Sequence, residues 1–288
     1  MTAAARPAGP VAVIGAGTMG SGIAQAFASS GYETLLLDVE RRFVDRAVGG
    51  IEKSLSKFVE KGKMSESDKT ATLARIRGGT DLEAAAKATL VVEAVPEVLE
   101  VKRETFRRVA GVVPRDAILA TNTSSIPITE LANGVPEPSR FIGMHFMNPV
   151  PLMALVEVVR GLATSDETTE RVMETARGLG KTPVLVRDFP GFVSNRVLLP
   201  MINEAVFALM EGVATRESID TVMKLGMNHP MGPLALADLI GLDVCLDILE
   251  VLHRGFGDPK YRPCPLLRQM VQAGWLGRKT GRGFYEYA

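Results

Sequence analysis

The stretch Val11-Ala-Val-Ile-Gly15-Ala-Gly-Thr-Met-Gly20 decides the fold of this 288-residue chain. It opens with an apolar run that predicts a short buried strand, and a helical pattern starts near Thr18 and stops before Gly31. The G-x-G-x-x-G spacing allows a tight turn, close approach of the backbone to a pyrophosphate, and close packing of helix on strand. The stretch therefore predicts a dinucleotide-binding loop formed by Gly15, Gly17, Thr18, Met19 and Gly20.

A second strand, Thr34–Leu37, is followed at once by Asp38. In a strand-helix-strand unit, a carboxylate at this place bonds the hydroxyls of the adenosine ribose. It also repels a 2′-phosphate, which favours NAD over NADP, although Arg41 and Arg42 can weaken that discrimination. A fortuitous glycine turn between core elements is disfavoured because the whole strand-helix-strand context is present. We expect NAD as the cofactor, with NADP as the second choice.

A helical insertion is expected over residues 40–78. A long amphipathic pattern runs up to Gly62, with apolar residues on one face. Ser65 and Asp68 then form a capping box for a further helix, which is expected to end at Gly78-Gly79. This insertion interrupts the alternation of strands and helices that the first strand begins.

That alternation resumes afterwards and defines the first domain. Helical patterns open at Glu97 and at Asp166. The strand candidates between and around them are Leu90–Val95, Ala117–Ala120, Phe141–Phe146, Leu155–Val159 and Pro183–Val186. Residues 1–188 are therefore expected to form a dinucleotide-binding α/β domain, a Rossmann-like doubly wound sheet with the helical insertion.

The pattern changes after Asp188-Phe189-Pro190-Gly191, where no convincing strand follows. Helical periodicity is found in Val193–Glu211, Arg216–Leu225, Leu234–Leu252 and Leu266–Gln272. Residues 189–288 are therefore expected to form a smaller all-α domain for substrate binding and dimerisation. Its apolar helices are too numerous for one small core, which favours a homodimer.

Composition and charge exclude several classes of partner. Lys and Arg number 33, as do Asp and Glu, so no basic field favours nucleic acid or an anionic membrane. No charge-free apolar run reaches the roughly 18 residues of a membrane helix. Met1–Pro10 lacks the apolar region of a signal peptide, so we expect a cytoplasmic protein. Cys245 and Cys264 lack metal-ligand spacing and are interpreted as structural thiols, with no metal site.

His145 is a candidate general base. It lies where the strand Phe141–Phe146 runs out towards Asn148-Pro149, and an apolar setting can hold histidine ready to exchange a proton near neutral pH. Glu157 follows after a proline-containing turn, which can bring its carboxylate back beside the imidazole and stabilise the cation. For one histidine considered alone, a satisfied core residue remains the commoner explanation.

Five motifs occur together in the order seen in 3-hydroxyacyl-CoA dehydrogenases, and the chain resembles that family. They are Gly15-Ala-Gly-Thr-Met-Gly20, Val91-Val-Glu-Ala-Val-Pro-Glu97, Asn122-Thr-Ser-Ser125, His145-Phe-Met-Asn-Pro149 and Gly191-Phe-Val-Ser-Asn195-Arg196. The resemblance continues through Met231-Gly-Pro to Asp243 and through Gly277-Arg-Lys-Thr-Gly281 to Tyr285, so it covers nearly all of the chain.

The resemblance implies a reaction and a set of residues. It implies hydride transfer between NAD(P) and the 3-carbon of a short 3-hydroxyacyl-CoA such as (S)-3-hydroxybutyryl-CoA, giving the 3-ketoacyl-CoA, in fatty acid (β-oxidation) or butyrate metabolism. His145 would be the general base with Glu157 as its partner, and Ser124 and Asn195 would hold the reacting oxygen. The implied cofactor contacts are Asp38, Glu97, Lys102, Ser124, Asn148 and Lys279.

Ser124, Asn195, Glu97 and Lys102 each have a structural alternative. Ser124 and Asn195 could simply cap helices. Glu97 could be an acid favoured by a helix dipole, and Lys102 could lie on a solvated face. The joint match of the motifs favours the functional roles, with the chemistry in the cleft between the two domains.

A basic helix face in the insertion is assigned to coenzyme A by the same resemblance. Lys53, Lys57 and Lys61 recur at helical spacing opposite the apolar face. A solvated face is the commoner explanation for three such lysines. The resemblance reverses this preference, because Ser54 and Lys61 match the positions that contact the coenzyme A part of the substrate.

Three other functions remain open. β-Hydroxyacid dehydrogenases share the two-domain plan but use a lysine base in the helical part, and Gly191-Phe-Val-Ser-Asn195-Arg196 offers no lysine. Gulonate dehydrogenase has a lens crystallin relative that is essentially structural. A dinucleotide-binding sensor needs no base, carboxylate and oxygen-binding set. Acyl chain length cannot be read from residue types, because one methylene changes binding by only about 1–3 kcal/mol.

Overall fold

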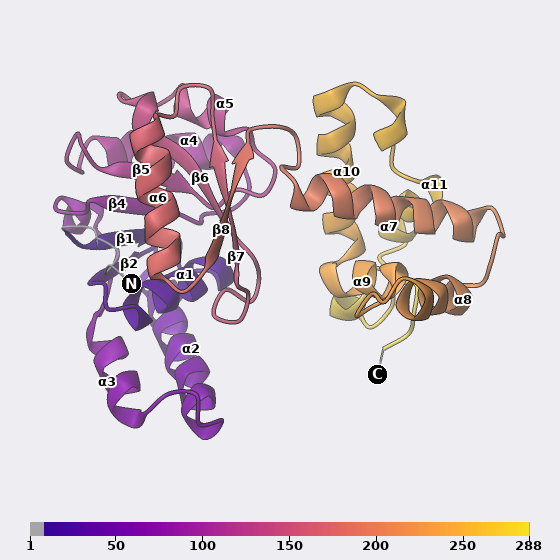
Figure 1. The fold of residues 1–288 in the computed structure, drawn as a ribbon, viewed down its shortest axis with the longest axis horizontal. Helices are drawn as coiled ribbons and strands as arrows, with labels where there is room; N and C mark the ends of the chain where they lie inside the picture. The colour runs from indigo at the N-terminus through magenta and orange to yellow at the C-terminus, as the bar shows by residue number, and fades with distance from the viewer. Residues whose placement is uncertain (1–8, 288) are drawn as a thin grey trace. The chain divides into compact units, whose positions relative to one another are not determined.

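The computed structural model describes residues 9–287, which divide into two compact units. The boundary lies between Asp188 and Phe189, where the last strand ends and the helical part begins. The first unit is α/β and the second is helical (Figure 1), so the predicted fold class is confirmed. None of the helices in residues 9–287 is long and apolar enough to cross a membrane.

The first unit is built on one eight-stranded sheet with the strand order β3-β2-β1-β4-β5-β6-β7-β8. Its strands are β1 (Val11–Ile14), β2 (Thr34–Leu37), β3 (Ile76–Gly79), β4 (Leu90–Glu93), β5 (Ile118–Thr121), β6 (Phe141–Phe146), β7 (Leu155–Arg160) and β8 (Thr182–Arg187). The six strands from β3 to β6 in this order, which include β1 and β2, run parallel to one another. β7 pairs antiparallel with β6 and parallel with β8. The carboxyl ends of β1, β2, β4, β5 and β6 therefore meet at one edge of the sheet.

Between residues 9 and 188, α-helices alternate with the strands of this sheet (Figure 1). They are α1 (Thr18–Ser29), α2 (Arg41–Glu60), α3 (Glu66–Ala74), α4 (Leu99–Ala110), α5 (Ile128–Ala132) and α6 (Asp166–Gly178), with short 3₁₀ turns at Leu82–Ala85 and Pro138–Arg140. The main core lies between β1, β4, β6 and β7 and the inner faces of α1, α2 and α6, where Phe27, Val92 and Val172 are fully buried. Burial of such side chains contributes roughly 1.5–3 kcal/mol each.

The insertion differs from the prediction at its end. The capping box is confirmed, because Ser65 Oγ accepts a bond from the Asp68 amide at 3.0 Å. The helix that follows stops at Ala74, however, and the expected helical end at Gly78-Gly79 is instead part of strand β3. A side chain at Gly78 would collide with Val44 of α2, so the glycines mark a strand that lies close beneath a helix.

The second unit packs its helices around a core of its own. It contains α7 (Ser194–Met210), α8 (Arg216–Thr221) extended by a π-helical turn (Val222–Gly226), α9 (Pro233–Ile240), α10 (Leu242–Phe256) and α11 (Pro265–Gln272), with 3₁₀ turns at Pro259–Tyr261 and Arg278–Thr280. One continuous helix over Leu234–Leu252 was wrong, because Gly241 has a φ of +107° and separates α9 from α10. Such a φ breaks a helix, and only glycine adopts it without strain.

Candidate active site

The phosphate-binding loop lies between β1 and α1 and has the shape that an anion requires. Gly15 has a φ of +102°, and a side chain there would meet the Ala94 carbonyl at 2.6 Å. A side chain at Gly20 would collide with the Gly15 carbonyl, whereas the space around Gly17 is open. α1 has no side-chain cap and no acidic residue in its first turn. Its positive end therefore suits a pyrophosphate, which can approach over Gly17.

Asp38 lies at the adjoining strand end. Its Oδ2 accepts a bond from the Ala16 amide at 2.6 Å, and its Oδ1 accepts one from the Val39 amide at 2.7 Å. A cavity of about 80 Å³ beside it is lined by residues of both strand ends and of α4. Asp38 therefore fixes the phosphate loop and also lines this cavity.

The two arginines after Asp38 are paired with acids of their own. Arg41 lies 2.8 Å from Asp45, and Arg42 lies 2.7 Å from Glu40. Exposed ion pairs of this kind are weak. They nevertheless reduce the positive charge that either arginine offers to a 2′-phosphate.

His145 and Glu157 lie directly opposite each other on the antiparallel strands β6 and β7. His145 Nδ1 is 2.8 Å from Glu157 Oε2, and both side chains are buried. On its other side, His145 Nε2 is 3.0 Å from Ser124 Oγ. The carboxylate fixes the ring and the tautomer that carries its proton on Nδ1, which leaves Nε2 to accept a proton, as a general base requires.

Glu97 holds the turn that carries Ser124. Its Oε1 accepts bonds from the amides of Ser124 and Ser125 at 2.8 and 3.0 Å and from the Thr123 hydroxyl at 2.5 Å. Glu97 precedes α4, whose N-cap is Val98, so it does not begin a helix. Ser124 is not a helix cap either, because Pro127 has that place in α5.

Lys102 is not on a solvated face. Its side chain is 1% exposed and lies between Glu93 and Glu97, at 2.7 and 3.2 Å. Sequence reasoning missed Glu93 as a site residue, although an acid within the apolar run Leu90–Glu93 was the available signal. Burial raises the pKa of Glu93, and the ammonium of Lys102 counteracts that effect.

Asn148 lies at the tip of the β6–β7 hairpin and is exposed. Lys181, which sequence reasoning did not single out, donates to the Val150 and Met153 carbonyls of this tip at 2.6 and 2.8 Å. A side chain at Gly22 of α1 would press on Val150 at 2.9 Å. The hairpin tip is thus fixed to α1, beside the phosphate loop.

Two predicted site residues belong to the helical unit. Asn195 is the second residue of α7, whose N-cap is Val193, so the N-cap role does not explain Asn195. Lys279 belongs to the 3₁₀ turn Arg278–Thr280, and its Nζ lies 2.6 Å from the carboxylate of Asp243 in α10. The loop residue therefore has a fixed charged partner.

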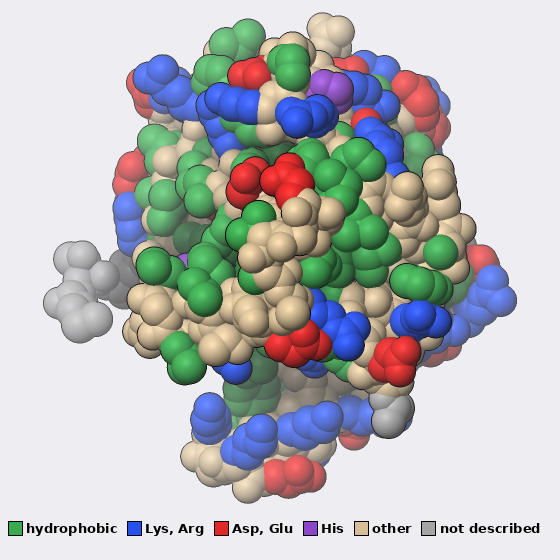
Figure 2. All heavy atoms as spheres, turned by 90° about the vertical axis from the view of Figure 1, so that its right-hand side faces the viewer, with side chains coloured by type: hydrophobic (Ala, Val, Ile, Leu, Met, Phe, Trp, Pro, Cys, Tyr) green, Lys and Arg blue, Asp and Glu red, His purple; other side chains and the backbone are tan. Residues whose placement is uncertain are grey.

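The predicted coenzyme A residues lie on α2 and just after it. Ser54 is half-buried, and Lys53, Lys57 and Lys61 are exposed. Basic side chains gather along the bottom of Figure 2, where the α2–α3 hairpin lies. This surface can attract phosphates, but the attraction is screened by salt.

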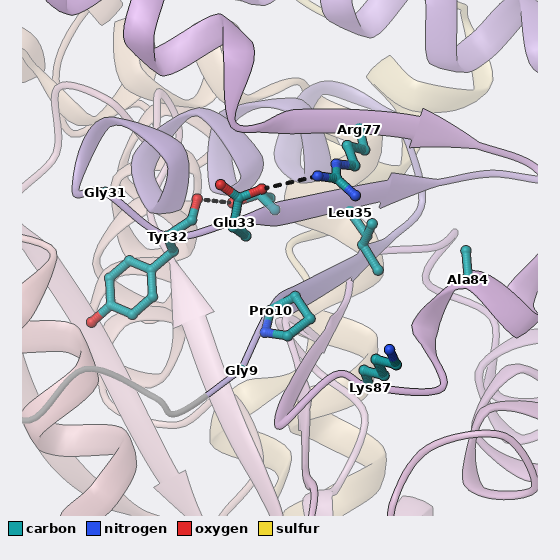
Figure 3. A pocket seen from close by; sticks show the side chains of 10 residues that line it. Gly9, Pro10, Gly31, Tyr32, Glu33, Leu35, Arg77, Ala84 and Lys87 are labelled. Carbon is teal, nitrogen blue, oxygen red and sulfur yellow. Dashed lines mark hydrogen bonds and ion pairs between the residues drawn. The ribbon is translucent and has the colours of Figure 1, made fainter.

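The opposite edge of the sheet holds a pocket with no comparable chemistry. It measures about 470 Å³ and is lined by residues near the starts of β1, β2, β3 and β4, among them Pro10 and Lys87 (Figure 3). Its acid, Glu33, pairs with Arg77 at 3.9 Å. All predicted site residues of the first unit, apart from those on α2 and at its end, lie at the other edge or in the hairpin beside it.

Comparisons with known proteins agree with this geometry. Residues 10–189 match the NAD-binding domain of 3-hydroxyacyl-CoA dehydrogenase, and residues 191–287 match its C-terminal domain. A probable 3-hydroxybutyryl-CoA dehydrogenase of Deinococcus radiodurans is 61% identical, over 96% of this chain and 99% of that protein. A Bacillus subtilis protein of the same description is 57% identical, over 96% of each chain.

A solved structure extends the agreement to three dimensions. The crystal structure of (S)-3-hydroxybutyryl-CoA dehydrogenase from Ralstonia eutropha matches with a TM-score of 0.95 and 51% identity, over 97% of this chain and 99% of that one. The match spans both units, the NAD-binding one and the helical one. The chain therefore belongs to the 3-hydroxyacyl-CoA dehydrogenase family and is an NAD-binding oxidoreductase.

Proposed function

We propose that this protein interconverts (S)-3-hydroxybutyryl-CoA and acetoacetyl-CoA by hydride transfer to and from NAD. The observation that carries the proposal is the buried imidazole of His145, held between Glu157 at 2.8 Å and Ser124 at 3.0 Å. Because Glu157 holds Nδ1, the other ring nitrogen, Nε2, points at the Ser124 hydroxyl, beside which the substrate hydroxyl would bind. A relative and a structural neighbour named for this substrate support the acyl length.

In the oxidation, three groups act on one oxygen. His145 Nε2 takes the proton of the 3-hydroxyl while C3 gives its hydride to the nicotinamide, and the C3–O bond becomes a carbonyl. Glu157 stabilises the imidazolium that results. Ser124 and, from the helical unit, Asn195 hold the oxygen by hydrogen bonds as its charge changes. Reduction of the ketone runs the same steps backwards.

Asp38 is proposed to select NAD over NADP. Because its carboxylate binds the Ala16 amide and lines the cavity proposed for the nucleoside, Asp38→Ala should loosen the phosphate loop and remove the repulsion of a 2′-phosphate. We expect NADH to bind at least about tenfold more weakly and the preference over NADPH to narrow. Fluorescence titration with both nucleotides measures this, and unchanged NADH affinity would exclude the assignment.

Ser54 and Lys61 are proposed to contact the phosphates of coenzyme A. Lys61→Glu should raise the KM for acetoacetyl-CoA several-fold, most strongly at low salt, and leave NADH affinity unchanged. Lys87→Glu, an exposed lysine at the opposite edge of the sheet, is the matched control. With a pantetheine thioester, which lacks the nucleotide phosphates, Lys61→Glu and wild type should behave alike. Equal impairment on both substrates would refute the contact.

The helical unit is proposed to bind substrate and to form a homodimer in a cytoplasmic enzyme. Large apolar side chains are exposed on it, among them Val197 at 68% and Leu225 at 81%, and apolar side chains gather on the face that Figure 2 shows. Exposure of this extent indicates a surface that another chain covers. Light scattering gives the mass, and a monomer at micromolar concentration would exclude the dimer.

One assay separates the proposed function from its rivals. Steady-state rates are measured with 3-ketoacyl-CoA substrates of increasing length, with NADH and with NADPH. We expect acetoacetyl-CoA and NADH to give the highest kcat/KM. Turnover of gulonate or of β-hydroxyacids instead would favour those relatives, and tight NADH binding without turnover would favour a sensor or structural role. Fatty acid or butyrate metabolism is the setting in which this reaction fits.

A further inference from the structure

Lys102 uses its donor capacity inside the protein. An ammonium group has three N–H bonds to donate. The Nζ of Lys102 lies 2.7 Å from Glu93 Oε1, 3.3 Å from the Val95 carbonyl and 3.2 Å from Glu97 Oε2. With its side chain 1% exposed, Lys102 therefore directs its ammonium at three oxygens of the protein itself.

Glu93 holds the ammonium group of Lys102 in place. It is fully buried at the end of β4 and accepts bonds at both oxygens. Oε1 takes the Val95 amide as well as Lys102, both at 2.7 Å, and Oε2 takes the Thr121 hydroxyl at 2.7 Å. Because Thr121 ends the neighbouring strand β5, Glu93 joins two strand ends to α4.

Glu97 carries the effect of Lys102 to the reacting groups. One oxygen faces Lys102, and the other accepts the Ser124 and Ser125 amides. Burial would raise the pKa of Glu97, but Lys102 and the donors of the turn outweigh it and hold that pKa below its usual value. A carboxylate that must accept several bonds at one oxygen does so best when ionised.

We propose that Lys102 and Glu93 are positioning residues for the reaction: Glu93 fixes Lys102, Lys102 fixes Glu97, and Glu97 fixes the backbone of Ser124. The Ser124 hydroxyl then meets His145 at 3.0 Å. The inference rests on the role proposed above for Ser124. It assigns Lys102 an indirect action on the reaction, through a chain of contacts that crosses from β4 to β6.

The first test is Lys102→Met, which removes the ammonium and keeps an apolar chain of similar length. We expect kcat to fall about 100-fold through displacement of Ser124, with less than a threefold change in NADH affinity. Arg107→Met, which removes an exposed cation from the same helix, is the matched control and should leave kcat unchanged. Weaker NADH binding at normal kcat would show a direct cofactor contact and overturn the proposal.

Glu93→Gln/Lys102→Met separates positioning from a general loss of stability. A lone charge left in the interior destabilises a fold, whereas removal of both charges restores balance. The double variant should therefore unfold at a higher temperature than Lys102→Met while kcat stays low, because Glu97 still lacks its cation. Recovery of kcat together with thermal stability would show that the pair is only structural, and the proposal would fail.

The last arm repeats Lys102→Met in a Ser124→Ala background. If Lys102 acts through Ser124, the added substitution should change kcat by less than about twofold there. A further 100-fold loss would mean that Lys102 acts by another path, and the inference alone would fall. If Ser124→Ala by itself left kcat at the wild-type value, the proposed role of Ser124 would fail, and this inference with it.

Discussion

Buried carboxylates occur in both units of the molecule, but they bind different kinds of partner. In the first unit, Glu157 and Glu93 lie against the side chains of His145 and Lys102. In the second unit, Asp238 accepts bonds from the backbone amides of Phe284 and Tyr285, both at 2.9 Å, and one from the Tyr287 hydroxyl at 3.0 Å. An acid beside a histidine or a lysine can direct a proton or hold a charge, whereas an acid whose main partners are backbone amides fixes a chain segment in place.

Asp220, a second aspartate of the helical unit, also connects separate chain segments. Asp220 accepts the Leu234 and Ala235 amides at the start of α9, at 2.9 and 3.0 Å, and the Tyr285 hydroxyl at 2.8 Å. A side chain at Gly232 would collide with Asp220, and one at Gly283 would collide with Asp238. Together these contacts tie the C-terminal segment to α8 and α9. The comparison predicts that substitutions in the first unit reduce rate and that substitutions in the second reduce stability.

The largest expected effect is on the rate of the His145→Gln enzyme. Glutamine keeps a polar side chain but cannot take up the proton of the 3-hydroxyl, so we expect kcat to fall by about 1,000-fold. NADH affinity and the unfolding midpoint should change little. Steady-state kinetics measure kcat, titration with NADH measures the affinity, and thermal unfolding measures the midpoint. A near-normal kcat would remove His145 from the role of base and break the comparison at its first member.

Glu157→Gln should have the same kind of effect at smaller size, roughly 100-fold on kcat. The amide preserves the hydrogen bond at Nδ1 only in part and cannot stabilise the imidazolium. If the two residues act as a unit, the double variant His145→Gln/Glu157→Gln should be little slower than His145→Gln. Independent action would instead give multiplied losses in a double-mutant cycle.

Asp238→Ala tests the other side of the comparison. It leaves two buried amides without their acceptor, and we expect the free energy of unfolding to fall by about 3 kcal/mol. The kcat of the protein that remains folded should stay within a few-fold of wild type. Urea unfolding followed by fluorescence gives the first quantity. Unchanged stability with a large loss of kcat would place Asp238 in the chemistry instead.

The smallest effect is expected for Tyr285→Phe, and it depends on pH. Burial, followed by the hydrogen bond to Asp220, raises the pKa of Tyr285. The unfolded chain ionises this tyrosine near pH 10 and the folded protein only above that, so its contribution is complete below about pH 10 and is lost as pH rises further. Tyr285→Phe should lower the free energy of unfolding by about 1 kcal/mol at pH 7. It should also reduce the fall of that free energy with pH above about pH 10. If the free energies of unfolding of wild type and Tyr285→Phe fell equally with pH above about pH 10, the prediction would be contradicted.

The sequence by itself determined the outline of the fold and the chemical groups of the site. Apolar runs and helical spacing located the strands β1, β2 and β4 to β8, because periodicity is a local property of the chain. The glycine spacing marked the phosphate loop, because close backbone contacts leave no room for a side chain at Gly15 or Gly20. His145 and Glu157 were identified through one motif and its turn.

Only the tertiary structure decided how distant segments meet, and with them the partners of Lys102. Strand β3 was missed because its pairing with β2 and its closeness to Val44 are contacts between distant segments. The break at Gly241 was missed because a single glycine in an apolar helical pattern has little weight locally. Lys102 was expected on the surface or at the cofactor, and its burial between two acids depends on where β4 and the Ser124 turn lie. Burial of a charge is set by the neighbours that neutralise it, and those neighbours come from other parts of the chain.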